Sequence, residues 1–344
     1  MRILIASDEP CFTVGLARGY ALLGHEVLLG AQNFVQRLGT FDIVHFLWPE
    51  EYTCRQEPDD STLAGISDAL DWWGQRARLL ISVNNFYPHG LEGNPAYRQL
   101  YGLFYSKCHA IHHFSNASRE AVCREWPAAL SKPQAVTTGF NYEHLLRCDA
   151  DRTALRDALG VNPGDMVVLV FGTLRKWDEV RLIMKAVSAA HVPNLRLLIV
   201  ARYSVGGLSA RAWLKRKMWD AWCRWHRAIT VGRFVPDEQV YRYLMASDVV
   251  LVPRINDLSS ALPALAMTFG RMVIAPNHGA FPEYLAGSRN LLYESGIARS
   301  LAAAIRQAAA SDREEIGREN RQLAAAKPWS SIAEVCLKLV RDGV

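Results

Sequence analysis

Residues 248–283 restrict the fold of this chain more than any other stretch, because they specify a complete strand–loop–helix–strand unit. The short apolar run Val249–Val252 is followed by a proline and has the character of a buried strand. After a polar loop, serines precede an Ala- and Leu-rich segment that stops at Gly270, which predicts a helix. Met272–Ala275 predicts the next strand. Strands that are joined through a helix run parallel, so this unit predicts an α/β fold.

The loop that follows Val249–Val252 is the first candidate for a functional site. At the carboxyl edge of a parallel sheet, such a loop and the N-terminus of the next helix face the same crevice. The free N–H groups and partial positive charge of a helix N-terminus favour a phosphate, and Ser259 and Ser260 add hydroxyl donors there. We therefore predict a phosphate site at these two serines. The alternative is an ordinary βαβ unit in which Ser259 only caps the helix.

The rest of the sequence continues the alternation of strands and helices. A polar, turn-rich stretch, Asn162–Asp165, separates two series of apolar segments. We therefore predict two domains, residues 1–160 and 165–325, and a last helix in residues 326–344. The segments with strand character in the two series are Arg2–Ser7, Val27–Gly30, Phe41–Glu50 with its loop, Arg78–Val83, Ala110–Ser115 and Ala135–Thr138, and then Met166–Phe171, Leu195–Ala201 and Ile229–Gly232.

The composition is that of an ordinary soluble enzyme. Of the 344 residues, 50% are hydrophobic and 21% are charged. No apolar run approaches the ~20 residues that span a bilayer, and Met1–Ile5 leads directly into a strand, so we expect no signal peptide. The 7 cysteines are scattered and lack metal-type spacing, which predicts reduced thiols in a cytoplasmic protein and no metal site.

The net charge of +5 favours anionic substrates or an anionic membrane surface. Nucleic-acid binding is not expected, since the sequence has no zinc finger and no stacking motif. The basic and aromatic segment Ser209–Arg227 is predicted to be a helix that either packs its apolar face on its domain or contacts anionic lipid headgroups. The second option would place the protein peripherally on the inner face of the membrane. The apolar face of this helix carries Leu214, Met218, Ala221, Trp222 and Trp225.

Several short motifs resemble one family of enzymes. Ala266–Gly270 and Val273–Pro276 are similar to the Ala-Met-Ala-x-Gly and Pro-Val-Val-Ala text in the donor-binding region of GT-B glycosyltransferases, especially the retaining enzymes of family 4. Asp42–Glu50 and Asn84–His89 resemble a bacterial glycan-assembly sub-group of that family, which reads DIVHxxWPE and HNLYPH at these places. Arg233–Val240 resembles the family's text before a nucleotide-binding helix. The resemblance covers almost the whole chain.

This resemblance implies the GT-B fold, with two Rossmann-like β/α/β domains facing a central cleft. Residues 1–160 would form the acceptor-side domain, residues 165–325 the nucleotide-sugar domain, and helix 326–344 would cross back to the first domain. The implied activity is that of a hexosyltransferase, which moves a sugar from a UDP- or GDP-sugar to a glycan or glycolipid acceptor. Retaining members of the family need neither a protein nucleophile nor a metal, and the nucleotide-sugar is a substrate, so no cofactor is expected.

In the first domain, the resemblance implies that Asn84 contacts the donor sugar where the family has a histidine, and His89 matches a second family histidine. Glu50, beyond a strand end, is placed to meet an acceptor hydroxyl. An inverting enzyme would need a base in this domain, for which Asp8, Glu9, Glu50 and His89 are the candidates. Retention and inversion both remain open.

In the second domain, the resemblance implies that Arg175, assisted by Lys176, neutralises the donor diphosphate. The backbone after Ile229–Gly232 would pair with the nucleotide base, and Asp257 takes the position of a family glutamate. The donor site predicted in this way comprises Arg175, Lys176, Arg202, Phe234, Val235, Asp257, Ser259, Ser260 and Glu283.

Some positions depart from the family pattern and leave a second interpretation open. The usual His, Arg, Lys and Glu are replaced by Asn84, Thr173, Asp178 and Leu265. Asp178 matters most, because a carboxylate near a diphosphate is repulsive by about 1 kcal/mol or more. The alternative to an active enzyme is therefore a catalytically weakened homologue that regulates or scaffolds an active partner. A GT-B epimerase or phosphorylase is a third alternative, although a phosphorylase would want a cofactor lysine and a longer chain.

Overall fold

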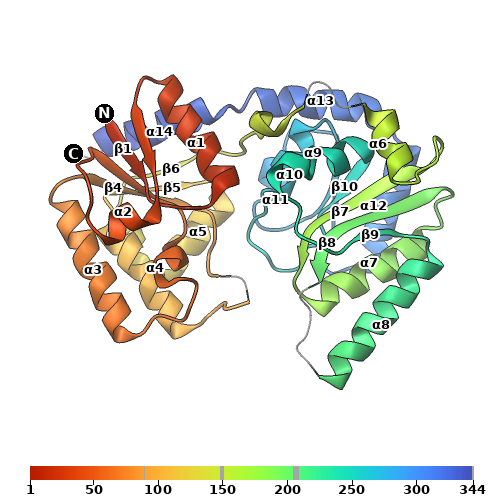
Figure 1. The fold of residues 1–344 in the computed structure, drawn as a ribbon, viewed down its shortest axis with the longest axis horizontal. Coiled ribbons are helices and arrows are strands. Elements are labelled where there is room, and N and C mark those ends of the chain that lie inside the picture. Colours follow the sequence, from red (N-terminus) through yellow and green to blue (C-terminus); the bar gives the residue numbers. More distant parts are fainter. Residues whose placement is uncertain (89, 148–150, 204–208, 343–344) are drawn as a thin grey trace. The chain divides into compact units, whose positions relative to one another are not determined.

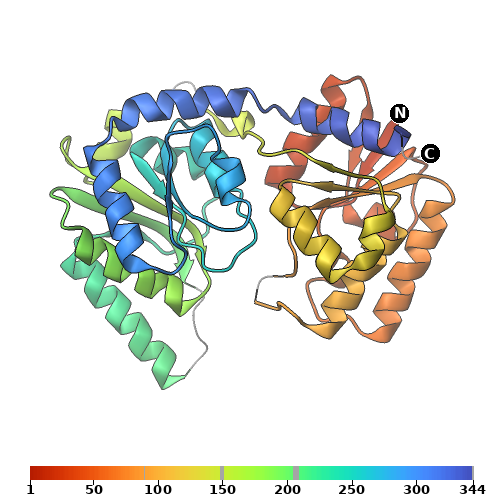
Figure 2. The ribbon, with the colours of Figure 1, turned by 180° about the vertical axis from the view of Figure 1, so that it is seen from behind.

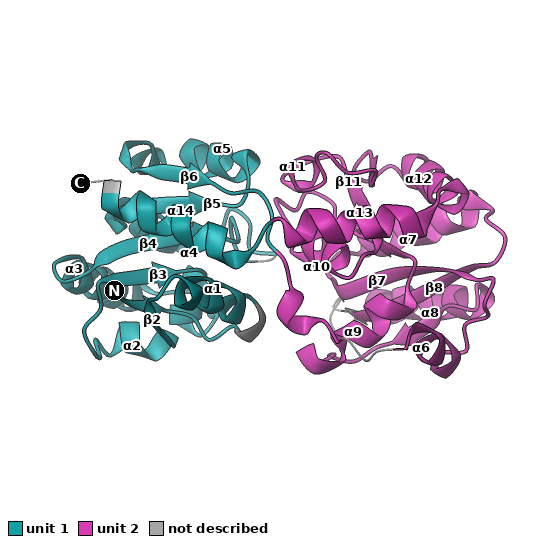
Figure 3. Cartoon of the chain, turned by 90° about the horizontal axis from the view of Figure 1, so that it is seen from above, with its two compact units in different colours: residues 1–140, 327–344 teal, residues 141–326 magenta. Residues whose placement is uncertain are grey.

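The computed structural model describes residues 1–88, 90–147, 151–203 and 209–342. The chain divides into two compact units, which Figure 3 colours separately. The first unit comprises residues 1–140 and 327–344, and the second comprises residues 141–326. Each unit contains a parallel sheet (Figures 1 and 2), and each has its own hydrophobic core.

The first unit is built on a parallel sheet with the strand order β2-β1-β3-β4-β5-β6. Its strands are β1 (Arg2–Ile5), β2 (Glu26–Leu29), β3 (Ile43–Phe46), β4 (Arg78–Val83), β5 (Ala110–His113) and β6 (Gln134–Val136). Its helices are α1 (Pro10–Leu22), α2 (Ala31–Val35), α3 (Asp60–Gly74), α4 (Pro95–Lys107), α5 (Asn116–Glu125) and α14 (Trp329–Asp342), with 3-10 turns η1 (Pro49–Thr53) and η2 (Pro127–Ser131).

Alternate residues of the central strands point to opposite faces of this sheet, and both faces are covered. On one face, Val44, Leu79 and Ile81 pack with Trp73 of α3 and Phe104 of α4 in a fully buried core. Helices α1 and α14 pack together on the other side. Full burial of one such apolar side chain stabilises the fold by about 1.5–3 kcal/mol.

A line of buried polar side chains links α1 to the strands. The Tyr20 hydroxyl lies 3.0 Å from His45 Nδ1, and Ser82 Oγ lies 2.7 Å from His45 Nε2. Ser82 Oγ also lies 2.9 Å from His112 Nδ1, and His112 Nε2 is hydrogen-bonded to Thr137. Burial lowers the pKa of His45 to about 3. These histidines are therefore neutral links between α1, β3, β4 and β5.

Helix α14 belongs to the first unit although it follows the second unit in the sequence. Its first residue, Trp329, packs edge-on against Phe12, with ring centroids 4.7 Å apart, and beside Phe140 at 5.0 Å. A Cβ on Gly15 of α1 would overlap the Trp329 indole, and one on Gly19 would lie 2.5 Å from the Trp329 carbonyl. The two glycines therefore allow the close approach of α1 and α14.

The second unit is built on a parallel sheet with the strand order β12-β11-β10-β7-β8-β9. Its strands are β7 (Met166–Leu174), β8 (Leu195–Tyr203), β9 (Ile229–Val231), β10 (Val249–Leu251), β11 (Met272–Pro276) and β12 (Leu291–Tyr293). Its helices are α6 (Arg152–Ala158), α7 (Trp177–Ala190), α8 (Ala210–Trp225), α9 (Asp237–Ala246), α10 (Leu262–Thr268), α11 (Phe281–Tyr284), α12 (Ala298–Ala310) and α13 (Arg313–Ala325), with the 3-10 turn η3 (Glu143–Leu145).

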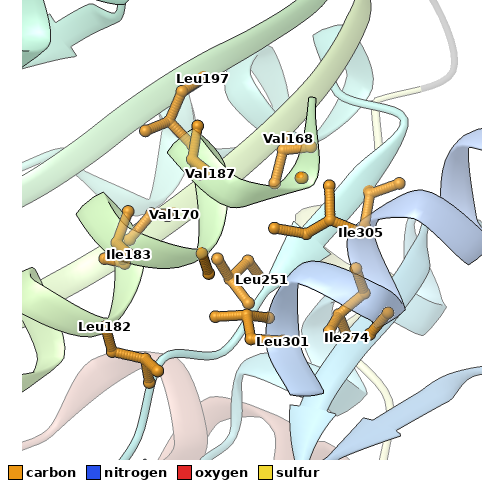
Figure 4. Packing of buried hydrophobic residues seen from close by; sticks show 14 of the residues in the cluster. Val168, Val170, Leu182, Ile183, Val187, Leu197, Leu251, Ile274, Leu301 and Ile305 are labelled. Carbon is orange, nitrogen blue, oxygen red and sulfur yellow. The ribbon is translucent and has the colours of Figure 1, made fainter. Parts of the chain in front are cut away.

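Two apolar layers sandwich this second sheet. Figure 4 shows one of them, in which Val168 and Leu251 of the strands meet Ile183 of α7 and Ile305 of α12. The other layer packs strand residues against α9 and α10, where Leu244 is fully buried. A sheet covered on both faces needs apolar residues at successive positions, which explains why its strands are continuous apolar runs.

Helix α8 packs through a different face from the one that the sequence predicted. Its buried residues are Ala212, Trp219 and Cys223, because Trp219 fills a place in the core that includes α7. Leu214 and Trp225 of the predicted face are exposed instead. In the part of the chain that the structure describes, no helix combines the length and apolar character needed to cross a bilayer.

The two parallel sheets confirm the predicted α/β class, but two local predictions are wrong. The residue pattern predicts a loop over Asp8–Thr13 and a helix over Val14–Leu23. Helix α1 instead begins at Pro10, because Glu9 caps it by accepting a hydrogen bond from the N–H of Phe12 at 2.9 Å. Strand β7 continues to Leu174, three residues beyond its predicted end at Phe171, because its backbone pairs with β8 over its whole length.

The units divide between residues 140 and 141, earlier than the predicted boundary at 160–165. The Asn141 side chain donates a hydrogen bond to a backbone carbonyl of α13 at 3.3 Å. The N–H of Tyr142 donates to Thr268 Oγ1 at 3.0 Å. These contacts join residues far apart in the sequence, so a turn-rich stretch was a poor guide to the boundary.

We expect the first unit to lose stability as the pH falls, because its buried histidines resist protonation. In the unfolded chain a histidine binds a proton near about pH 6.5, whereas burial holds the pKa of His45 at about 3 and that of His113 at about 4. The stabilising contribution is complete above about pH 6.5 and is lost as the pH falls toward these values. The loss reaches about 1.4 kcal/mol per pH unit for each histidine. Thermal unfolding between about pH 7.5 and about pH 4.5 measures it.

A His45→Gln variant supplies the matched test, since glutamine keeps hydrogen-bonding capacity toward Tyr20 and Ser82 but does not titrate. The stability of this variant should depend less on pH than that of the unmodified chain. The exposed His191, changed to Asn, should leave the dependence unchanged. An equally steep pH dependence in His45→Gln would contradict the prediction.

Candidate active site

The strand order of the second sheet identifies where a ligand is expected. The sheet grows from β7 in both directions, through β8 and β9 on one side and through β10, β11 and β12 on the other. In open α/β sheets, ligands bind beyond the carboxyl ends of the strands at such a switch point. Arg175 and Lys176 follow β7, while Arg254 and Asp257 follow β10. The residues predicted to meet a diphosphate therefore lie at this switch point.

These side chains form one connected charge cluster. Arg175 Nη1 lies 2.9 Å from Asp257 Oδ2, and Arg254 Nε lies 3.5 Å from the same oxygen. Arg254 Nη1 also lies 2.9 Å from Glu179 Oε1. Lys176 Nζ lies 4.0 Å from Asp257 Oδ1. The cluster thus joins three cations and two carboxylates.

Exposure divides the charge cluster into an inner and an outer part. The side chains of Arg254 and Glu179 are 7% and 0% exposed, whereas those of Arg175 and Lys176 are 27% and 39% exposed. Burial lowers the pKa of Arg175, the charge of Arg254 adds to this effect, and Asp257 opposes it. The inner ion pair braces the outer cations, which remain accessible to an anion.

Glu179 was not predicted as a site residue, yet it holds the turn that carries the outer cations. It is the third residue of α7, and its Oε2 accepts hydrogen bonds from the N–H groups of Arg175 at 2.7 Å and Lys176 at 3.2 Å. A glutamate three residues after a helix N-cap is a known capping signal, so the sequence contained a sign of this role. Its second bond, to Arg254, depends on the folded sheet.

Thr173 and Asp178, which depart from the family pattern, make contacts that the sequence did not predict. Thr173 lies within β7, and its carbonyl accepts a hydrogen bond from Arg254 Nη1 at 2.9 Å. The Asp178 side chain is 73% exposed and pairs with Arg181 of its own helix at 3.7 Å. Asp178 therefore makes its ion pair on the surface of α7 and not within the charge cluster.

The loop that carries Asp257 is held by the loop after β11. The N–H of Ala280 donates a hydrogen bond to the Leu258 carbonyl at 2.8 Å. Gly279 has a φ of 57°, and a Cβ at this position would overlap the same carbonyl, so glycine is needed for this approach. Burial lowers the pKa of His278, and Asp257 opposes this effect. His278, which was not predicted, therefore lies next to the charge cluster.

Ser259 and Ser260 lie in the loop between β10 and α10. The predicted helix start at these serines is wrong, because α10 begins at Leu262 with Ala261 as its N-cap and no side-chain cap. Ser260 Oγ accepts a hydrogen bond from the N–H of Leu262 at 3.3 Å. The hydroxyl of Ser259 is hydrogen-bonded to Tyr284, whose pKa burial raises. Their predicted contact with phosphate stays a prediction.

The remaining predicted donor residues come from three other segments of the second unit. Val235 is buried and Phe234 is 62% exposed in the connection between β9 and α9. Glu283 lies in the short helix α11, and Arg202 lies in β8. Leu265, which stands where the family has a glutamate, lies within α10 and packs partly buried against the core.

The first sheet has a corresponding switch point between β1 and β3. The N–H of Asp8 donates to Glu51 Oε2 at 3.3 Å, and Asp8 Oδ1 accepts from the N–H of Ala31 at 3.2 Å. Burial raises the pKa of Glu51, the charge of Asp8 adds to the rise, and a hydrogen bond with Ser7 opposes it. Glu51, which was not predicted, is thus a partly buried acid beside Asp8.

Glu50 is buried, and both of its carboxylate oxygens have partners. Oε2 accepts a hydrogen bond from the Tyr101 hydroxyl at 2.6 Å, and Oε1 accepts one from Asn85 Nδ2 at 3.1 Å. Asn84 is partly buried and donates to a carbonyl of β4 at 3.4 Å. Glu50 therefore anchors the segment that contains Asn84. His89, the other predicted residue of this segment, lies outside the described residues.

We compared the sequence of the chain with models of known protein families. Residues 165–311 match the model of the family described as Glycosyl transferases group 1. The chain therefore carries a glycosyltransferase domain. The matched segment runs from the start of β7 through α12 and contains the whole charge cluster. No curated protein sequence matches the chain.

Solved structures resemble the glycosyltransferase over its full length. Sucrose-phosphate synthase from Thermosynechococcus elongatus is 15% identical with a TM-score of 0.72, and the match covers 99% of this chain and 98% of that one. Anabaena HepE in complex with UDP and glucose is 18% identical with a TM-score of 0.70, covering 99% and 100%. The catalytic domain of Arabidopsis thaliana starch synthase IV, bound to ADP and acarbose, is 12% identical with a TM-score of 0.70, covering 99% and 98%. These similarities confirm the predicted GT-B fold.

The positive groups at the switch point of this glycosyltransferase are its own side chains, Arg175, Lys176 and Arg254. Within residues 1–88, 90–147, 151–203 and 209–342, no group of three or more His, Cys, Asp or Glu side chains is placed to hold a metal ion.

We expect the change Glu179→Gln to destabilise the second unit by about 3 kcal/mol. The amide keeps the size of the side chain but removes the charge that compensates buried Arg254. Chemical unfolding of the two proteins measures the difference. Asp178→Asn, one residue earlier on the exposed side of the same helix, is the matched control and should cost less than about 1 kcal/mol. Equal losses in the two variants would contradict a bracing role for Glu179.

Proposed function

We propose that the chain transfers a hexose from a UDP- or GDP-sugar to a glycan or glycolipid acceptor, with retention at the anomeric carbon and without a metal ion. The observation that carries this proposal is the charge cluster at the switch point of the second sheet. Its three cations lie where doubly wound sheets bind their ligands. The membership in family 4 and its bacterial glycan-assembly sub-group is part of the proposal.

The charge cluster is suited to a departing nucleoside diphosphate. Charge builds on the leaving diphosphate as the bond to the sugar breaks, and fixed cations stabilise that charge without reorganising. Arg175 and Lys176 are the accessible cations, so they meet the phosphate oxygens. Arg254 stays paired with Glu179 and Asp257, so it positions Arg175 instead of reaching the ligand.

The other donor residues are assigned to the nucleoside and the sugar. The backbone at Phe234 and Val235, after β9, is assigned to the base, and Glu283 to sugar hydroxyls. HepE binds UDP and starch synthase IV binds ADP, which supports a nucleoside diphosphate as the leaving group here. Arg202, at the end of β8, completes the proposed donor side.

In the described part of the first unit, the contacts of Glu50 favour retention. An inverting enzyme needs a free base, and both oxygens of Glu50 are engaged. In a retaining reaction the leaving phosphate takes the acceptor proton, and Asn84 and His89 contact the sugar. The anomeric configuration of the product, read by NMR, tests this assignment.

The interpretation as a weakened homologue loses its main support in the structure. It depended chiefly on a carboxylate at Asp178 that would repel the diphosphate, and this side chain pairs with Arg181 on the surface of α7. The replacement of a ribose-binding glutamate by Leu265 remains, and we expect it to weaken donor binding without abolishing it.

Arg175→Ala should weaken nucleotide binding by roughly tenfold or more, because a hydrogen bond to a charged group contributes about 1.5–3 kcal/mol. Isothermal titration with UDP, GDP and ADP measures the affinity and identifies the base. Arg181→Ala is the matched control, since Arg181 pairs only on the surface with Asp178 in the contacts described. Unchanged nucleotide affinity in a folded Arg175→Ala protein would rule out the proposed role.

The double change Ser259→Ala and Ser260→Ala should reduce nucleotide affinity while changing the melting temperature little. The N-cap residue of α10 is Ala261 and Ser260 accepts only one 3.3 Å hydrogen bond from the first helical N–H, so the full loss of about 1 kcal/mol that follows removal of an N-cap is not expected. Titration and thermal unfolding of the same preparation separate the two effects. Normal affinity in this variant would place the phosphate away from the serines.

A further inference from the structure

Helix α8 has two apolar faces, and among the described residues only one of them has a partner. The inner face carries Ala212, Trp219 and Cys223, which are buried against the second unit. Trp219 stacks on Trp222, with ring centroids 5.4 Å apart and planes at 10°. Packing of the helix on its own domain is complete through this face, so it does not account for the apolar residues on the opposite side.

The outer face carries a continuous apolar stripe. Leu214 is 54%, Met218 49% and Trp225 86% exposed, and Ala221 between them is exposed as well. These residues are spaced four, three and four apart, which places them in one line along the helix. Trp213, which is 62% exposed, lies beside this outer stripe.

Basic residues border the outer stripe on both sides. With 3.6 residues per turn, Arg211 falls on one side and Lys217 and Arg224 fall on the other. Lys217 Nζ lies 5.7 Å from the centre of the Trp213 ring, so a cation of this border contacts an exposed aromatic ring. The charged residues of α8 are Arg211, Lys215, Arg216, Lys217 and Arg224 against the single acid Asp220.

We propose that the outer stripe of α8 docks the protein on an anionic lipid bilayer, with the helix lying in the plane of the interface. An apolar stripe between two rows of cations matches acyl chains below and phosphate headgroups on both sides. Tryptophan is suited to this boundary because its ring is apolar and its N–H is polar. The inference does not rest on the proposed transferase activity, since docking needs neither donor nor acceptor.

The charge pattern favours a lipid surface over other occupants. A nucleic acid would use the cations but would leave the exposed Leu214 and Met218 in water. A second copy of the chain would bring the same cations against each other, with only Asp220 on the helix to offset them. A bilayer that contains anionic lipids satisfies the apolar stripe and both basic borders together.

Co-sedimentation with vesicles tests the proposal. The full-length protein should bind vesicles of phosphatidylcholine that contain roughly a third phosphatidylglycerol, bind pure phosphatidylcholine tenfold or more weakly, and be released between about 0.1 M and about 1 M salt. The fluorescence of Trp225 is obtained as the difference between the protein and its Trp225→Phe variant. On vesicle binding, this fluorescence should shift to the blue, and brominated acyl chains should quench it.

Two pairs of variants separate the stripe and the charges from general effects. Leu214→Ser with Trp225→Ser, and separately Lys217→Glu with Arg224→Glu, should each weaken binding tenfold or more. The matched controls are Leu22→Ser with Leu130→Ser, whose side chains are 79% and 67% exposed elsewhere, and Arg318→Glu with Lys338→Glu, which change the net charge equally. All variants alter exposed residues, so melting temperatures should confirm that they are folded.

The proposal is overturned by any of four results. These are no sedimentation with anionic vesicles, equal binding to neutral vesicles, binding that is insensitive to salt, and equal losses in the control variants. A dimer in solution that the Leu214→Ser, Trp225→Ser protein cannot form, without vesicle binding, would instead identify a second copy of the chain as the occupant. A failure of nucleotide binding in the Arg175 experiment leaves this result unaffected, so the two proposals fail independently.

Discussion

The buried ion pair between Arg254 and Glu179 is the interaction on which the candidate donor site depends. It joins the loop after β10 to the first turn of α7, and Glu179 also accepts the two N–H groups that lead into that turn. Removing either partner would leave an uncompensated charge in the interior, which costs several kcal/mol. The pair is retained at a place where it fixes the backbone that carries Arg175 and Lys176. Its contribution is therefore to geometry as much as to stability.

The first unit has a similar arrangement near the carboxyl ends of its strands, where a buried carboxylate anchors partly exposed polar residues. Glu50 takes the hydrogen bonds of Tyr101 and Asn85, and the Asn84 amide lies next to this anchor in the chain. Burial raises the pKa of Tyr101, and the charge of Glu50 adds to the rise, so the phenol remains a donor. In both units a polar residue beyond a strand end is oriented by a partner that water does not reach, which is how a site is preorganised.

Helix α8 shows how a single element can serve the core and a surface at once. Its inner face is anchored by Trp219, while Trp225, two turns away on the other side, is exposed. Most of the predicted apolar face points outward, and only Trp222 of that face packs partly against the core. The large side chain that fills the core, Trp219, belongs to the other face. The spacing of apolar residues along a helix reveals that apolar faces exist, but it cannot say which of two such faces packs.

The sequence by itself determined the fold class and most of the strands, because continuous apolar runs separated by caps and glycines suit only a covered parallel sheet. It also placed Arg175 and Asp257 correctly after their strands, since strand ends mark one edge of such a sheet. Only the tertiary structure decided that Arg254 and Glu179 brace these residues, that Asp178 turns to the surface, and that the units divide at residue 140. These outcomes depend on contacts between segments that lie far apart in the chain. The physical reason is that local sequence patterns determine backbone conformation and periodicity. The ion-pair partner of a charged residue depends instead on which strands lie next to each other in the folded sheet.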